Sequence, residues 1–180
     1  MPWTTPRTWV TSEMVTAALL NTYLRDNLQF ARDQVAARIH RSAAAGNQSI
    51  SNAADNRVDM DTIDFDTTGT IVDLANDRLT FPVAGKYIVG ANARFVANAT
   101  GHRELRIYYH DSVANVDVRV DLDGSEAVTG MAPVMSTDTI FDCKAGDYVY
   151  LAVWQNSTAA LNLIVLEPAD PVLYIAREGI

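Results

Sequence analysis

Residues 116–122 read "VDVRVDL", and this stretch decides the fold class. Valine and leucine alternate with charged residues here, and successive side chains of a strand point to opposite faces of a sheet. Turns such as "PVAGK", "ATGH" and "KAGD" separate the strand-like segments at intervals typical of a β-sandwich or jelly roll. The sequence therefore predicts an all-β, antiparallel domain, with further strands in the segments 87–95, 105–109, 134–142, 147–155, 161–166 and 172–178.

The N-terminal segment has a different pattern. Residues 1–14 contain two prolines and two tryptophans without a period, which indicates an extended leader. Thr16 is placed to cap a helix, and the apolar spacings of four and three after it predict about 20 helical residues, ending near Ala36 or Ala37. We therefore expect a leader and attachment helix at 1–37 and a jelly-roll domain at 38–180. The apolar stripe of the helix consists of Leu20, Leu24, Leu28, Ala31 and Val35.

Composition and charge exclude several classes of partner. The chain has 180 residues, of which 48% are hydrophobic and 20% charged, as in a globular domain that buries a core. Its net charge of −8 disfavours binding to nucleic acid or to anionic lipid. The apolar runs are shorter than the ~20 residues of a membrane span, and residues 1–20 lack the pattern of a signal peptide. We expect a soluble protein made in the cytoplasm of a host cell.

Catalytic chemistry is not indicated by any motif. The sequence has no nucleophile motif, no glycine-rich phosphate loop and no zinc-ligand spacing, so we expect no enzyme and no cofactor. Cys143 is the single cysteine, and we interpret it as a small half-buried hydrophobic residue. Asp121 and Asp123 are weak candidates for calcium ligands, but alternating aspartates are more simply the solvent face of a strand. We therefore expect no metal site.

Two stretches of the β region carry a resemblance to a known family. "LTFPVAGKYIVGANARF" (79–95) and "FDCKAGDYVYLAVWQNSTAALNL" (141–163) show a "G-x-Y" strand followed later by an "a-G-D-x-V" strand. This layout resembles the tumour-necrosis-factor-like jelly roll, whose superfamily includes the heads of complement's collagen-tailed recognition protein. The resemblance covers about residues 38–180 and implies a trimer packed through aromatic strands. Tyr148, Tyr150 and Trp154 share one strand face and are the residues expected there; the alternative is that they belong to the core.

The N-terminal segment resembles a second group of proteins. "TWVTSEMVTAALLNTYLRDNL" (8–28) is similar to the N-terminal segment of many tailed-phage virion proteins, where it precedes a variable C-terminal domain. The resemblance implies a virion component and favours docking of Trp3, Trp9 and Val15 on a capsid or tail protein. Large rigid side chains of this kind dominate protein interfaces. The alternative is that the tryptophans fold back on their own domain.

A helix of this length is marginal in water on its own, so its stripe must be buried against the sandwich or against other copies. We favour three parallel helices in a short coiled coil. The sequence thus predicts a non-enzymatic, homotrimeric virion protein of the head-fibre, decoration or tail-fibre type, anchored by its N-terminal segment. Two alternatives stay open: a receptor-binding tail-tip module that recognises a host-surface glycan, and a polysaccharide depolymerase with paired carboxylates.

Overall fold

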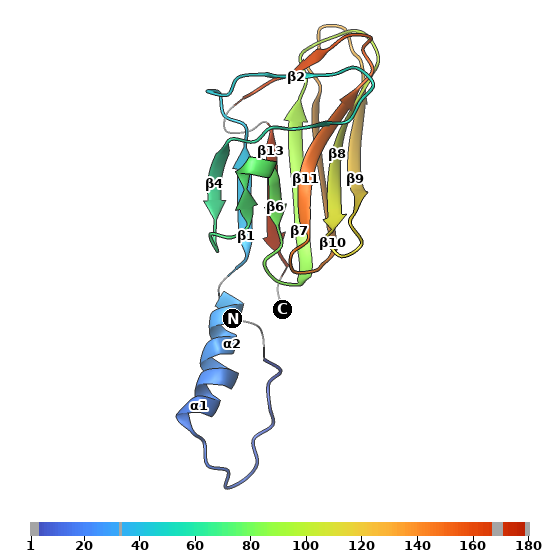
Figure 1. The fold of residues 1–180 in the computed structure, drawn as a ribbon. Coiled ribbons are helices and arrows are strands. Elements are labelled where there is room, and N and C mark those ends of the chain that lie inside the picture. Colours follow the sequence, from blue (N-terminus) through green and yellow to red (C-terminus); the bar gives the residue numbers. More distant parts are fainter. Residues whose placement is uncertain (1–3, 33, 167–170, 179–180) are drawn as a thin grey trace.

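The computed structural model describes residues 4–32, 34–166 and 171–178, and strands are its main regular structure (Figure 1). The helical segments are α1 (Ala17–Leu20), the π-helical turn η1 (Asn21–Arg25), α2 (Asp26–Arg32) and the 3-10 turn η2 (Leu74–Asn76). The strands are β1 (Ala36–His40), β2 (Gln48–Ile50), β3 (Asn56–Arg57), β4 (Thr62–Asp66), β5 (Val72–Asp73), β6 (Arg78–Thr80), β7 (Gly85–Arg94), β8 (His102–Asp111), β9 (Val116–Glu126), β10 (Val134–Cys143), β11 (Tyr148–Gln155), β12 (Leu161–Leu163) and β13 (Val172–Arg177).

Two antiparallel sheets face each other across one core. The first has the order β10-β7-β13-β1-β4, and the second has the order β5-β6-β11-β8-β9, with β3 also paired to β11. Neighbours within the first sheet are not consecutive in sequence: β13, the last strand, lies between β7 and β1. This crossing order is that of a jelly roll, so the predicted fold class is confirmed.

The core is built from the inward face of each alternating strand. In β7 and the residue after it, every second side chain is almost completely buried, as the period of two predicts. Phe81 packs beside Tyr87 with ring centroids 4.7 Å apart, and both rings are fully buried. The inward residues of this stretch are Tyr87, Val89, Ala91, Ala93 and Phe95.

Two carboxylates tie the loops of the sandwich to its strands. Asp147, fully buried in the turn before β11, accepts hydrogen bonds from the hydroxyl of Tyr109 and from the N–H and hydroxyl of Ser112. Burial alone would raise the pKa of Asp147, but these hydrogen bonds outweigh it and lower the pKa. Asp66 follows the same rule, since its pKa is lowered, against the effect of burial, by the backbone N–H groups of Val72, Thr68, Ile71 and Gly69.

The helix ends earlier than its apolar spacing predicts. Thr16 caps it as expected, accepting a hydrogen bond from the Leu19 N–H at 3.3 Å, but the last helical residue is Arg32. Val35, predicted to be on the helix, is buried in the core of the sandwich instead, and Ala36 begins β1. Pairing of β1 with both β13 and β4 supplies backbone hydrogen bonds that a continued helix would forfeit, which corrects the expected end near Ala36 or Ala37.

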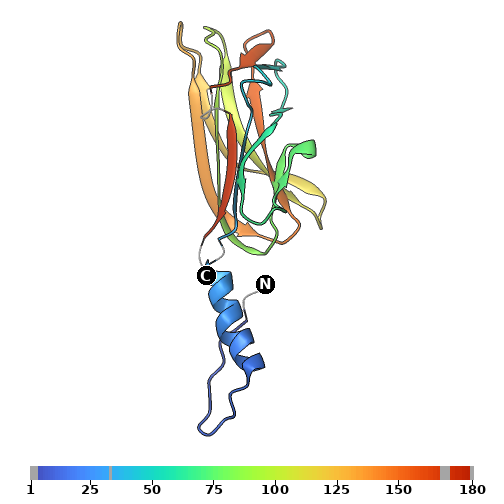
Figure 2. The ribbon, with the colours of Figure 1, turned by 90° about the vertical axis from the view of Figure 1, so that its left-hand side faces the viewer.

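The helix does not lie across the open end of its own sandwich. In two perpendicular views, α1 and α2 extend away from the end of the sandwich at which β1 begins and β13 ends (Figures 1 and 2). The leader runs along the helix before turning into α1 (Figure 1). The chain therefore presents two regions of different character, and we call residues 4–32 the N-terminal unit.

Candidate interaction surfaces

A buried asparagine clamps the leader to the helix within the N-terminal unit. The Asn27 side chain accepts a hydrogen bond from the Thr4 N–H at 2.9 Å and donates one to the Thr4 carbonyl at 2.7 Å. The same amide group also donates to the Tyr23 carbonyl one helical turn earlier, at 3.3 Å. Asn27 thereby satisfies both backbone groups of Thr4 and fixes the start of the leader against α2.

Trp9 packs on the helix of its own chain. Its ring meets that of Tyr23 edge to face, with centroids 6.4 Å apart, and the Arg7 guanidinium lies 4.9 Å from the Trp9 ring centroid. Arg7 in turn pairs with Glu13 across the turn of the leader. Trp9 nevertheless remains 41% exposed. The leader thus folds back on the helix at Trp9, while a large part of this ring stays exposed, and its role as a partner anchor stays a prediction.

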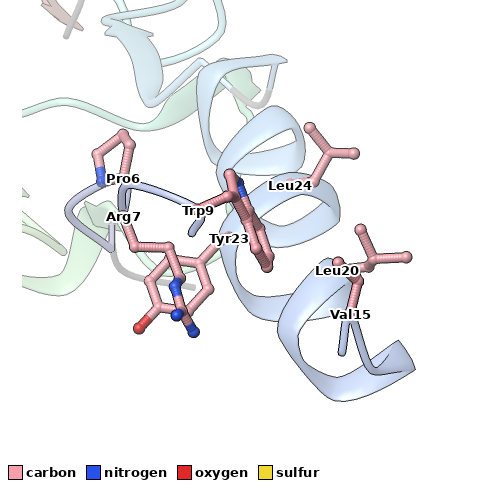
Figure 3. Close-up of a pocket in the computed structure, with 7 residues that line it drawn as sticks. All are labelled: Pro6, Arg7, Trp9, Val15, Leu20, Tyr23 and Leu24. Carbon is pink, nitrogen blue, oxygen red and sulfur yellow. The ribbon is translucent and has the colours of Figure 1, made fainter. Parts of the chain in front are cut away.

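The leader and the helix enclose a groove of about 200 Å³ (Figure 3). The residues expected to anchor a partner and those expected to trimerise the helix meet there, because Trp9 and Val15 line the groove together with Leu20 and Leu24. The remaining lining residues are Pro6, Arg7 and Tyr23. Trp3, also predicted to be an anchor, lies outside the described residues.

The leucine stripe is exposed in a single copy of the chain. Leu20, Leu24 and Leu28 are 44%, 55% and 62% exposed. The Asp26 N–H donates to the Asn21 carbonyl, five residues earlier, and this wide π turn suits a spacing of four residues between the leucines. Ala31 is also helical, within α2, whereas Val35 is not. The predicted helical surface therefore has Leu20, Leu24 and Leu28 as its described apolar side chains.

A second predicted surface is the outer face of β11. Tyr148, Tyr150 and Trp154 share one face of the strand, opposite to the core residues Val149, Leu151 and Val153. Their rings are partly covered within the same chain: arginine guanidinium groups lie 3.7 Å from the Tyr150 centroid, 4.3 Å from that of Tyr148 and 5.4 Å from that of Trp154. The arginines are Arg57, Arg78 and Arg106, respectively.

Rings of the neighbouring strand β8 complete this face. Tyr108 stacks on Tyr150 at 5.3 Å and His110 stacks on Tyr148 at 4.4 Å between centroids. The Tyr108 hydroxyl donates to Asp55 at 2.9 Å. Because stacked rings and arginines cover the aromatic faces, this surface is a cross-strand ladder that stabilises the sheet. Its role as a trimer interface stays a prediction.

The edges of the other sheet expose apolar side chains that sequence reasoning did not single out. Val134 and Ile140 on β10 are each 52% exposed. Ile63 and Phe65 on β4, the opposite edge of this sheet, are about half exposed as well. The only signal in the sequence was an apolar residue out of phase with its strand, as Ile140 is beside the inward-facing Phe141.

Asp121 and Asp123 bridge the two sheets. Asp121 accepts a hydrogen bond from the Thr137 hydroxyl at 2.6 Å, and Asp123 accepts one from the Ser136 N–H at 3.0 Å, so that β9 is tied to β10. Among residues 4–32, 34–166 and 171–178, no three or more His, Cys, Asp or Glu side chains form a group that could hold a metal ion.

The Cys143 thiol is buried. Burial, followed by the nearby Asp147 and Asp142, raises its pKa to about 12, so the reactive thiolate is scarce at neutral pH. In the part of the chain that the structure describes, no helix has the length and apolar character needed to cross a membrane.

Comparisons with known proteins identify the fold. No family profile matches the chain. An uncharacterized protein of Acanthamoeba polyphaga mimivirus is 27% identical over 94 residues, which span 52% of this chain and 40% of that protein.

Two solved structures are similar over most of the chain. Eiger TNF from S. frugiperda matches with a TM-score of 0.65 and 12% identity, over 82% of this chain and 94% of that one. Murine APRIL at pH 5.0 matches with a TM-score of 0.61 and 11% identity, over 81% of this chain and 99% of that one. Identities this low show the fold alone: the β region is a tumour-necrosis-factor-like jelly roll.

Proposed function

We propose that this protein is a non-enzymatic, homotrimeric component of a virus particle, of the fibre-head or decoration type found in tailed phages. The N-terminal unit assembles and attaches it, and the jelly roll is displayed outward. One observation carries the proposal: a helix that extends away from the sandwich has three leucines about half exposed in one copy of the chain. An apolar surface of this kind marks a protein interface.

The energetics favour burial of this stripe by association. Burying the exposed half of each leucine contributes about 1 kcal/mol, or about 3 kcal/mol for each chain. Association costs at least about 4 kcal/mol in lost translational and rotational freedom, so the leucines of all three chains, with further contacts, are needed.

Contacts between the sandwiches supply part of the association free energy that the leucines do not. The exposed Val134 and Ile140 at the β10 edge are better suited to this than Tyr148, Tyr150 and Trp154, whose rings already have partners in their own chain. Apolar atoms that are still in contact with water contribute more on burial than rings that are already covered.

Assignment to a virus particle is supported by two similarities. The stretch "VTAALLN…LRDNL" (15–28) is similar to the attachment segment of tailed-phage virion proteins, and part of the chain is similar to a mimivirus protein. The partner for attachment is a capsid or tail protein. No observation favours glycan binding at the aromatic face, because its rings are covered by arginine side chains.

The test is the solution mass of the full chain, measured by light scattering over a range of concentrations. The triple variant Leu20→Ser, Leu24→Ser, Leu28→Ser should raise the midpoint concentration of dissociation at least about a hundredfold. Leu166→Ser, which changes a similarly exposed leucine outside the unit, is the matched control and should leave the midpoint unchanged. A monomeric wild-type chain, or a triple variant with the wild-type midpoint, would contradict the proposal.

A further inference from the structure

We infer that the leader and the leucine stripe form one composite interface, and that its occupant is the same unit in other copies of this chain. This inference rests on the proposed self-association and changes the part played by the leader. Trp9 and its neighbours are then built into the trimer contact, instead of forming an arm reserved for a different protein.

The first argument is the continuity of the apolar surface. Leu20 and Leu24 belong to the stripe and also line the groove beside Trp9 and Val15, so a chain that covers the leucines also meets the leader. The leader adds large apolar side chains that are as exposed as the leucines: Trp9 at 41%, Val15 at 49%, Val10 at 66% and Met14 at 83%. Together they more than double the number of exposed apolar side chains in the unit. Three leucines alone would bury too little apolar area for a stable interface.

The leader is already held in place within a single chain. Asn27 holds both backbone groups of Thr4, and the Trp9 ring is held between Tyr23 and Arg7. The leader is therefore ordered before any partner arrives, so binding loses little conformational freedom in it. An arm that acquires its shape only on a distant partner would not require this clamp.

The net charge of the N-terminal segment also favours contact between copies of the unit. Assembly about an axis brings identical charges together, and like charges repel each other. Residues 1–33 have three arginines against three acidic residues, so the net charge of −8 belongs entirely to residues 34–180. Two ion pairs within one chain, Arg7–Glu13 and Arg25–Asp26, neutralise the unit further. An apolar unit within an electrically neutral segment therefore fits a second copy of itself better than the acidic sandwich does.

The experiment measures the mass of the full chain by analytical ultracentrifugation over a range of concentrations. Trp9→Ser removes the exposed ring and leaves the hydrogen bonds between Asn27 and Thr4. Asn27→Ala removes those hydrogen bonds and leaves every apolar side chain in place. Each should raise the midpoint concentration of dissociation at least about tenfold. Val113→Ser, which changes an exposed valine in the turn between β8 and β9, is the control and should have no effect. Far-UV circular dichroism checks that each variant keeps its β structure.

The outcomes separate this inference from the proposed function. A wild-type trimer that dissociates on Leu24→Ser, with Trp9→Ser or Asn27→Ala within about twofold of the wild-type midpoint, overturns the composite interface and leaves helical self-association intact. A wild-type chain that is monomeric at every concentration overturns both, and the surface then belongs to a different protein. Weakening by Trp9→Ser and by Asn27→Ala supports the inference.

Discussion

The sandwich and the N-terminal unit differ in how much of their apolar surface is buried within one copy of the chain. The sandwich buries a core of alternating apolar residues almost completely, although Val116, Val118 and Ile140 stay about half exposed, and residues 34–180 carry the net charge of −8. Residues 1–33 have no net charge, and the large apolar side chains of the N-terminal unit face water while a polar residue, Asn27, is buried. The difference indicates that the sandwich has its own core in a single copy, whereas the unit, as proposed, buries its apolar surface by association.

The largest effect on stability is expected at the buried carboxylate of Asp147, in the sandwich. Asp147→Ala removes the three hydrogen bonds that Tyr109 and Ser112 donate to a fully buried carboxylate, so we expect the free energy of unfolding to fall by about 3 kcal/mol. Urea denaturation followed by circular dichroism measures it. Asp142→Ala, at an exposed position in β10, should change stability by less than about 0.5 kcal/mol. Equal losses in the two variants would show that the hydrogen bonds of Asp147 do not stabilise the sandwich.

Acid should weaken the sandwich through the same groups. The pKa values of Asp147 and Asp66 are lowered in the folded state, so the stabilisation they give is complete above their ordinary pKa of 3.8. It is lost as the pH falls from there through the lowered values, because the folded state must then take up protons against its hydrogen bonds. Unfolding free energies measured from pH 6 down to about pH 2 test this. Asp66→Asn should flatten the curve below the ordinary pKa, and an unchanged curve would rule out this role for Asp66.

The smallest effect is expected at the aromatic ladder. Arg57→Leu removes the guanidinium 3.7 Å from the Tyr150 centroid and should cost about 1 kcal/mol of stability. The midpoint concentration at which the trimer of this variant dissociates should match that of the wild type, because this face stabilises the sheet within one chain. Dissociation of the trimer by this single change would instead show that the outer face of β11 is the interface, as the sequence alone predicted.

The fold could be predicted from the sequence because its evidence is local. Alternation at 87–95 and 116–122 is a property of neighbouring residues, and so is the Thr16 cap. The helical spacing between Ala31 and Val35 predicts that Val35 lies on the helix, but pairing of the adjacent β1 with β13 and β4 places it in the core.

Interaction surfaces were predictable only in part, for the same reason. The leucine spacing and Trp9 were visible in the sequence. The bond between Asn27 and Thr4 joins residues 23 positions apart, and the bonds of Asp121 and Asp123 cross from β9 to β10. No local pattern encodes such contacts, so the sequence did not predict the hydrogen bonds of Asn27, and it indicated only a solvent face for Asp121 and Asp123.

The most direct test of the account compares the mass of the full chain with that of residues 34–180. Beginning at Gln34 keeps Val35 in the core and β1 in its sheet, so the sandwich stays intact. We expect a trimer for the full chain and a folded monomer, or a trimer at least about a hundredfold weaker, for the sandwich alone. Trimers with equal midpoints would contradict it, because they would place assembly in the jelly roll and leave the N-terminal unit without a part in it.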